Sequence, residues 1–459
     1  MYDPYLAEIR FGTGLSPRRQ PPARLDDMLE KLAGPDVMAE AFPIPRTERM
    51  RPAEAELHAA VQAVRRAPAA GLEAARRARE ALFEEARRQR DRALVHTLLR
   101  GARTRDGMRE RLVAFWANHF TVVPRYGSTR HLVASYVEDV IRPHVTGRFG
   151  DMLRAVVRHP MMLHYLDQHR SIGPNSQYGR DTGRGLNENL ARELLELHTV
   201  GAGGPYGQKD VRELAELLSG LFSNTRRGFH YRVMTAEPGA EEVLGRSYGT
   251  PGGPERLEHV EAFLADVAVH PATARHLAGK LVRHFLSDVP DPAVVDRVAG
   301  TWRATGGDLL ACYDALLSHP AAWAPERRKV RLPVEYLQAA LRALDPPDRE
   351  VRNHERRIVQ VRYRRPLLRM GQEWENPLSP AGFPDRVSDW VTPQGLAARI
   401  DWAMEIPSQL ADPLPDPRRL AEVALGPFAT EEVLFAARAA ETRAEGVGLI
   451  LASAAFQRR

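Results

Sequence analysis

Residues 70–99 read AGLEAARRAREALFEEARRQRDRALVHTLL, and this stretch decides the fold class because it consists mostly of Ala, Arg, Glu and Leu. Those four residue types are among the strongest helix formers. The stretch therefore predicts one long helix. A break at Pro68 separates it from an earlier helical segment, and Gly101 is predicted to stop it, because proline interrupts a helix and glycine commonly follows its last turn.

The segments that follow this helix show the same helical spacing of apolar residues. Residues 106–160 predict three helices, and His119 falls on the apolar face of the first. Two more helices are predicted over 187–200 and 208–221. Residues 223–250 are rich in Gly, Tyr and Val and predict at most a small β-hairpin. We therefore expect an all-α fold with strands under ~10% of residues.

The distribution of proline and tryptophan suggests three parts of the chain. Residues 1–47 are rich in Pro and Arg and are interpreted as an N-terminal arm. Residues 48–345 are predicted to form a large multi-helix main domain that contains the candidate site. Residues 346–459 begin with coil containing Pro and Trp and end with short helices, which we expect to pack on the main body.

The charge of the chain invites a nucleic-acid interpretation that its composition weakens. The formal net charge is +6, but lysine occurs at only four positions, so nearly all of the 65 basic residues are arginine. The arginines alternate with 59 acidic residues instead of forming a basic stripe studded with aromatic residues. The composition therefore disfavours nucleic-acid binding, and the partner is expected to be a small molecule or a protein.

Targeting and redox features are few. The sequence contains no run of about 18 apolar residues, so no membrane span is predicted. No signal peptide is visible at the start, and these two observations favour a soluble, cytoplasmic protein. The single cysteine, Cys312, excludes an intrachain disulfide. No phosphate-binding loop, GxSxG elbow or HExxH metal motif is present, which removes the most readily recognised enzyme classes.

A His-Pro pair recurs three times at points where one apolar stretch ends and another begins. The pairs begin at His159, His270 and His319, and each proline suits the first turn of a helix. We expect the three histidines to hydrogen-bond to the backbone at these helix junctions.

The densest polar segment is the predicted helix over 187–198. Asn187 is a good N-cap, and Arg192 is spaced to pair with Glu188 and with Glu196 on one polar arc. A capped amphipathic surface helix explains this pattern. The alternative is a polar cleft in which the carboxylates, Glu193 included, bind a divalent metal or move protons.

The neighbourhood of this helix favours the cleft. The loop over 170–186 leads into the helix N-terminus and carries Arg184, an arrangement that suits an anion. Asp167 ends a short helix before the loop and is expected to face it. If the carboxylates turn inward, their charge must be offset, and the nearest groups in the sequence that could do so are His119, His159, Arg170, Arg180 and Arg184. An ordered loop packed against the start of the 187–198 helix is therefore predicted.

Several long motifs of the chain resemble one bacterial family, called domain of unknown function 1800. These are FWANHF at 115–120, HPMMLHYLD at 159–167, SIGPNS at 171–176, GLNENLARELLELH at 185–198, KVRLPVE at 329–335, SPAGFP at 379–384 and SAAFQRR at 453–459. The resemblance covers nearly the whole chain and implies a mainly helical protein without a settled biochemical activity.

The resemblance has two departures. Family members often carry a His-Asp-x-Gly-x-Lys segment, where this chain has Ala236, Glu237 and Glu241, so a site using that His and Lys is absent here. Many relatives also look exported, whereas this chain shows no signal. The resemblance further implies a partner role, because relatives are often encoded beside sulfatase-like proteins of a family numbered 1501.

Two functional hypotheses follow. The first is an enzyme, a hydrolase that is metal-dependent or uses acid–base chemistry. Its predicted catalytic residues are Glu193, Glu196, Arg192 and His119, and its predicted binding residues are Asn118, Asp167, Asn175, Asn187, Glu188, Asn189 and Arg184. The second is a non-catalytic binding or assembly protein that uses the arginine-containing loop as a docking surface. A buried carboxylate in a pocket would favour the first, and a flat exposed face the second.

Overall fold

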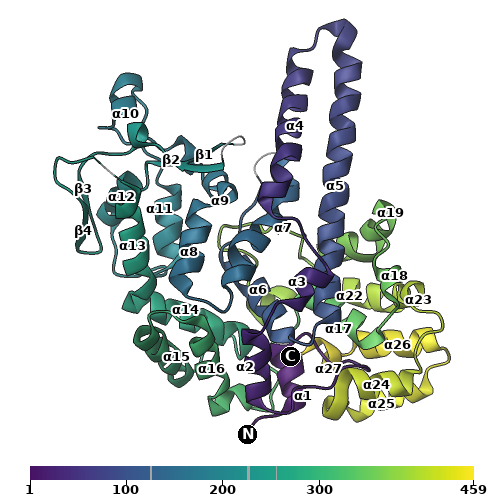
Figure 1. Cartoon of the computed structure of the whole chain (residues 1–459). Coiled ribbons are helices and arrows are strands. Elements are labelled where there is room, and N and C mark those ends of the chain that lie inside the picture. The colour runs from purple at the N-terminus through teal and green to yellow at the C-terminus, as the bar shows by residue number, and fades with distance from the viewer. Residues whose placement is uncertain (125–126, 225–227, 255) are drawn as a thin grey trace.

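The computed structural model describes residues 1–124, 127–224, 228–254 and 256–459 (Figure 1). It is 65% helical, which confirms the predicted all-α fold. Four short strands form two antiparallel hairpins, β1 (Leu221–Asn224) with β2 (Gly228–Tyr231) and β3 (Ala240–Val243) with β4 (Arg246–Gly249).

The strands lie in the region where a hairpin was expected, but two hairpins form instead of one. The second hairpin turns at Leu244 and Gly245, which both have positive φ angles, 53° and 75°. Such a pair suits the tight turns that match the twist of antiparallel strands. The Leu244-Gly245 dipeptide therefore supplies a turn that the sequence pattern did not reveal.

The first of two hydrophobic cores is centred on α6 and the helices around it. The buried indole of Trp116 packs against Phe149, which packs against Trp302, with ring centroids 5.6 and 5.1 Å apart. The core takes residues from α1 (Pro4–Leu6), α2 (Leu25–Ala33), α6 (Gly107–His119), α7 (Val133–Tyr136), α8 (Phe149–Arg158), α9 (Pro160–Tyr165), α11 (Asn189–Glu193), α12 (Gln208–Leu217), α13 (Leu257–Val269), α14 (Pro271–Phe285), α15 (Pro292–Thr305) and α16 (Leu309–Leu317).

The second core joins α5 (Leu72–Arg103) to the C-terminal helices. Tyr336 and Trp402 pack edge to face in it, 5.7 Å apart. The core draws on α17 (Pro333–Leu344), α18 (Asp348–Val351), α19 (Arg356–Val359), α20 (Arg365–Arg369), α22 (Pro393–Glu405), α23 (Pro407–Leu410), α24 (Pro417–Leu425), α25 (Glu431–Ala439), α26 (Arg443–Ala452) and α27 (Ala454–Gln457). The structure also contains the short helices α3 (Val37–Ala41), α10 (Gln177–Thr182) and α21 (Val387–Trp390).

The helical hairpin of α4 (Thr47–Arg66) and α5 projects from the body (Figure 1). The predicted break at Pro68 is confirmed. The predicted stop at Gly101 is wrong, since α5 continues to Arg103. At Gly101, a β-carbon would lie only 2.4 Å from Cδ of Gln338 on α17. Here glycine permits two helices to approach closely.

The three His-Pro junctions behave as predicted. His159, His270 and His319 are the N-cap residues of the helices that begin at the following prolines. Each Nδ1 accepts a hydrogen bond from the backbone N–H two residues later, at 3.1, 3.2 and 3.2 Å respectively. The imidazole thus satisfies one of the donors that a helix start leaves unpaired.

In the described part of the chain, no helix is long and apolar enough to cross a membrane.

Candidate functional site

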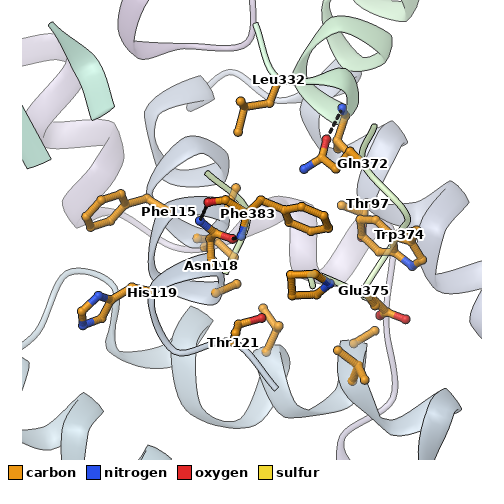
Figure 2. Close-up of a pocket in the computed structure, with 18 of the residues that line it drawn as sticks. Thr97, Phe115, Asn118, His119, Thr121, Leu332, Gln372, Trp374, Glu375 and Phe383 are labelled. Atoms are coloured by element: carbon orange, nitrogen blue, oxygen red, sulfur yellow. Dashed lines mark hydrogen bonds between the residues drawn. The ribbon is translucent and has the colours of Figure 1, made fainter. Parts of the chain in front are cut away.

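A cavity of about 330 Å³ lies between α5, α6, α17 and the segment 372–385 (Figure 2). Apolar side chains such as Val133 and Leu332 form much of its wall. Figure 2 shows Phe115 at one side of the view and Trp374 at the other, with Phe383 between them. The cavity is within the size range of small-molecule sites, which are mostly apolar with a few placed polar groups.

Asn118 fixes one wall of this cavity. Its Nδ2 donates to the Phe383 carbonyl at 3.0 Å, and its Oδ1 accepts from the Phe383 N–H at 2.7 Å (Figure 2). Gly382 next to it has φ of 84°, and a β-carbon there would lie 2.4 Å from the Asn118 carbonyl oxygen. Glycine is therefore required for this close approach. The paired bonds hold the 379–384 motif against the end of α6.

The same segment carries a carboxylate into a charged network. Asp385 Oδ1 lies 3.0 Å from Nδ1 of His284 and 3.8 Å from Nζ of Lys329. Burial alone would raise the pKa of Asp385, but His284 and Lys329 hold it well below its ordinary value. Asp385 is therefore ionised at neutral pH, and it shares Lys329 with Asp288, whose Oδ1 lies 2.6 Å from the same amine.

Lys280 on α14 contacts a histidine at the cavity wall. Its Nζ lies 2.9 Å from Nδ1 of His119, and Nε2 of His119 lies 3.2 Å from the main-chain carbonyl of His198. A carbonyl can only accept, so Nε2 carries the imidazole proton and Nδ1 accepts from Lys280. Burial, and then the charge of Lys280, hold the pKa of His119 well below its ordinary value, so its imidazole is neutral.

The surroundings of Lys280 contain imidazoles instead of a counterion. Burial lowers the pKa of His198 to about 3 and that of His276 to about 4, so both are neutral at pH 7. Among the described residues, no carboxylate lies within 4.0 Å of Lys280. Burial lowers the pKa of Lys280 to about 8, the charge of Asp385 opposes this shift, and the charge of Arg283 adds a smaller lowering.

The structure separates the residues predicted from sequence. Asn118 and His119 line the cavity, whereas the other nine are not among its described lining residues. Asp167 is buried in a left-handed backbone conformation after α9. The side chain of Asn187 accepts from the N–H of Asn189 at 2.8 Å, but the helix begins at Asn189, so Glu188 and not Asn187 occupies the N-cap position. Of the remaining seven, Asn175, Arg184, Asn189 and Arg192 are exposed, and Glu188, Glu193 and Glu196 are half-buried.

The predicted loop is ordered against the helix it precedes. The N–H of Asn187 donates to Oγ of Ser171 at 3.0 Å, and the Ile172 N–H donates to the Gly185 carbonyl at 3.2 Å. The first bond is the predicted contact between the 170–186 loop and the start of the helix, and the second joins the two ends of the loop. Asn175 anchors the loop further through Glu237, which accepts from its backbone N–H at 2.9 Å.

The helix over 187–200 departs from the predicted regular form. The α-helical part, α11, covers only Asn189–Glu193, and Leu194–His198 forms a π-helical turn. Arg192 pairs with Glu188 at 3.0 Å as expected. The second expected pair, to Glu196, is not formed in the described structure, because the wider turn rotates Glu196 away from the i+4 position.

Glu193 and Glu196 are half-buried, and His119 meets the end of their helix at the His198 carbonyl. Burial, together with the neighbouring charge of Glu196, raises the pKa of Glu193. The imidazole therefore reaches the same helical segment without a hydrogen bond to either glutamate in the described structure. The catalytic role of these two carboxylates stays a prediction.

Sequence reasoning missed Lys280. One signal was available, because His276, Lys280 and His284 are spaced four residues apart on one helix, and the chain has only four lysines. The contact itself joins residues 161 positions apart. Spacing within a helix does not reveal which other helix faces that surface.

Three carboxylates elsewhere have the spacing of a cation site. Glu213, Glu216 and Glu241 place one oxygen each within 4.8 Å of one another. Glu241 is buried, and burial, followed by the charges of Glu216 and Glu213, raises its pKa to about 8. The cluster therefore retains a proton at neutral pH instead of carrying three full charges.

We expect Glu241→Gln to stabilise the protein at pH 9 by about 1–3 kcal/mol and to change little at pH 5. The raised pKa of Glu241 favours folding below the unfolded-state value of 4.5, and this contribution is lost as pH rises through about 8. Thermal melts at both pH values measure the difference, with exposed Glu242→Gln as the control. An equal change at pH 5 and pH 9 would show that Glu241 is not protonated in the folded state.

Comparison with known proteins gives one match. A family model described as "Protein of unknown function (DUF1800)" matches residues 10–458. No curated protein and no solved structure matches the chain.

Proposed function

We propose that this chain, which belongs to the DUF1800 family over residues 10–458, is an enzyme that uses the Lys280 amine as a nucleophile toward the carbonyl group of a small molecule. One observation carries the proposal, the 2.9 Å contact between Lys280 and a neutral His119 that the His198 carbonyl orients. A nucleophile, an adjacent base and a third group that orients the base are the elements of an activated nucleophile.

The environment of Lys280 supports an amine that reacts near neutral pH. An ammonium group is not a nucleophile, and an ordinary lysine with a pKa of about 10.4 is almost entirely protonated at pH 7. Burial lowers the pKa of Lys280 to about 8, so roughly a tenth of it is free amine at that pH. This lowered pKa is typical of lysines that form imines with carbonyl substrates.

The proposed reaction balances without a redox partner. The Nζ lone pair of Lys280 attacks the carbonyl carbon, and the C=O π electrons move to oxygen. Nδ1 of His119 takes the proton that Nζ loses and returns it to that oxygen, and loss of water then forms the C=N bond. The positive charge of Lys280 is one of the causes that lower the pKa of His119. Because the neutral amine has no such charge, His119 accepts a proton more readily once Lys280 is deprotonated.

The apolar cavity supports the same reaction. Side chains such as Phe115 and Phe383 offer a surface for a hydrocarbon body, and exclusion of water favours imine formation over hydrolysis. The carboxylate-based hydrolase predicted from Glu193 and Glu196 is the competing proposal. The two can be separated, because neither glutamate is among the described residues of the cavity wall.

The proposal is tested by reductive trapping. Benzaldehyde and cyanoborohydride at pH 7.5 are expected to modify Lys280 at a rate roughly a hundredfold above that of Lys209, in proportion to free amine. Lys209 is exposed and paired with Glu242 at 3.1 Å, which raises its pKa, so it is the internal control. Peptide mass spectrometry locates the adduct.

Lys280→Met is expected to abolish the fast adduct, and Glu193→Gln to retain it. If the rates at Lys280 and Lys209 are equal, the amine is not activated and the proposed function fails. Loss of the fast adduct in Glu193→Gln with intact fold would instead favour the glutamate-based site.

A further inference from the structure

Two buried polar atoms of the cavity wall have no hydrogen-bond partner among the described residues. They are the indole Nε1 of Trp374 and the carboxylate Oε1 of Glu375, and both residues line the cavity. Figure 2 shows these two residues on the side of the cavity away from His119. Because a buried polar group without a partner costs free energy, an unpaired donor and an unpaired acceptor in one wall point to a ligand that pairs with both.

Arg90 of α5 holds these two consecutive residues in place. Its Nε lies 3.0 Å from Oε2 of Glu375, and its Nη2 donates to the backbone carbonyl of Trp374. The side chains of Arg90 and Glu375 are only 9% and 7% exposed. Glu375 has a φ of 58°, a left-handed conformation that residues with a side chain rarely adopt. The contacts with Arg90 therefore hold a strained part of the wall, which orders Trp374 and Glu375 before a ligand binds.

The carboxylate of Glu375 retains the capacity to accept a further hydrogen bond. Burial raises the pKa of Glu375, and the charges of Arg90 and Arg364 oppose this shift. The backbone N–H of Ala134, another residue of the wall, lowers the pKa as well. Each oxygen of a carboxylate can accept more than one hydrogen bond, so Oε1 can still accept from an O–H group of a ligand.

We infer that the cavity binds a mainly apolar molecule with a hydroxyl group, whose oxygen accepts from Trp374 and whose proton is donated to Glu375. An ammonium group could donate to Glu375 but could not accept from the indole, and a carboxylate would meet another carboxylate. A hydroxyl group forms both bonds with one oxygen atom. The apolar part of the wall, which includes Val133 and Phe383, takes the rest of the molecule.

This inference goes beyond the chemistry proposed for Lys280. When both hold, the substrate is a hydroxy aldehyde or a hydroxy ketone, with its carbonyl group at Lys280 and its hydroxyl group at Trp374 and Glu375. The binding test uses molecules without a carbonyl group. Its failure therefore leaves the proposed reaction of Lys280 standing, and failure of the reductive trapping leaves the hydroxyl site standing.

The test compares benzyl alcohol with ethylbenzene, which has nearly the same shape but forms no hydrogen bond. Isothermal titration calorimetry on the whole chain is expected to show binding of both. Trp374→Phe is expected to weaken binding of the alcohol about tenfold, as the loss of one hydrogen bond predicts, and that of ethylbenzene less than about twofold. Trp323→Phe is the matched control, because Nε1 of Trp323 donates to the Leu317 carbonyl and Trp323 is not among the described residues of the cavity wall.

Two further measurements use the native protein. The indole N–H resonance of Trp374, assigned by its loss in Trp374→Phe, should move further downfield with benzyl alcohol than with ethylbenzene, because a hydrogen bond to oxygen deshields the proton. Benzyl methyl ether can accept from Trp374 but cannot donate to Glu375. It is expected to bind about tenfold more weakly than the alcohol, with propylbenzene as the control for its greater length.

The inference is overturned if Trp374→Phe weakens binding of the alcohol no more than binding of ethylbenzene. Failure of both compounds to bind overturns it as well. Equal losses of alcohol binding in Trp374→Phe and Trp323→Phe would show that the loss follows from a general effect on the fold, and this result also contradicts a hydroxyl site at Trp374.

Discussion

Glu335→Ala is expected to destabilise the protein by about 3–5 kcal/mol, because it leaves two buried guanidinium groups without a counterion. Glu335 Oε1 lies 3.0 Å from Nε of Arg111, and Oε2 lies 3.1 Å from Nε of Arg459. The side chains of these three residues are 6%, 2% and 0% exposed, respectively. Chemical denaturation at pH 7 measures the loss.

The contacts of Glu335 with Arg111 and Arg459 also determine how the contribution of Glu335 to stability depends on pH. Burial alone would raise the pKa of Glu335, but Arg111 and Arg459 hold it below 4.5. Its contribution to stability is therefore present above pH 4.5 and is lost as pH falls through the folded-state pKa. Asp401→Ala is a suitable control, because Asp401 forms an exposed pair with Arg369 and should cost under about 1 kcal/mol. Equal losses for the two variants would contradict the buried network.

Asn118→Ala is expected to cost about 2–4 kcal/mol and to loosen the wall of the cavity. The substitution removes both hydrogen bonds to Phe383, at 3.0 and 2.7 Å, and leaves two backbone groups unpaired. The segment 379–385 should then exchange its amide hydrogens faster than in the native protein. Hydrogen exchange with mass spectrometry measures this directly.

The control for this prediction is Asn376→Ala, which removes a single side-chain bond to Glu373 at 2.7 Å in the same segment of the chain. It should leave exchange over 379–385 unchanged. If Asn118→Ala also leaves that exchange unchanged, the paired bonds do not hold the wall.

The parts of the fold that depend on neighbouring residues were predictable. The long helix needed only the Ala, Arg, Glu and Leu of residues 70–99, and it was found as α5. The His-Pro caps needed only an imidazole two residues before a free N–H, and His159, His270 and His319 all form that bond. Each of these features is satisfied within a few residues of chain.

Features of the fold that depend on residues distant in the sequence could not be predicted in this way. Gly101 looks like a helix stop until Gln338 of α17 is seen beside it. The regular helix predicted over 187–200 gives way to a π-helical turn at Leu194–His198, and this turn includes the carbonyl that His119 binds. Tertiary contacts override local propensity at both points.

The candidate site shows the same division. Asn118 and His119 were selected because they end an amphipathic helix, and both line the cavity. Their partners, Phe383 and Lys280, lie 265 and 161 residues away in sequence. The sequence alone does not show that these residues are in contact. The site was therefore predicted at the acidic helix over 187–198, which lies closer in the chain.

The pH dependence of labelling at Lys280 tests the central claim most directly. Trapping of benzaldehyde on this residue, measured by peptide mass spectrometry from pH 6 to 11, should be half-maximal near pH 8, because burial lowers the pKa of Lys280 to about 8. Lys209 in the same sample should become half-labelled only above pH 10. A midpoint for Lys280 that coincides with that of Lys209 would contradict an activated amine in the cavity.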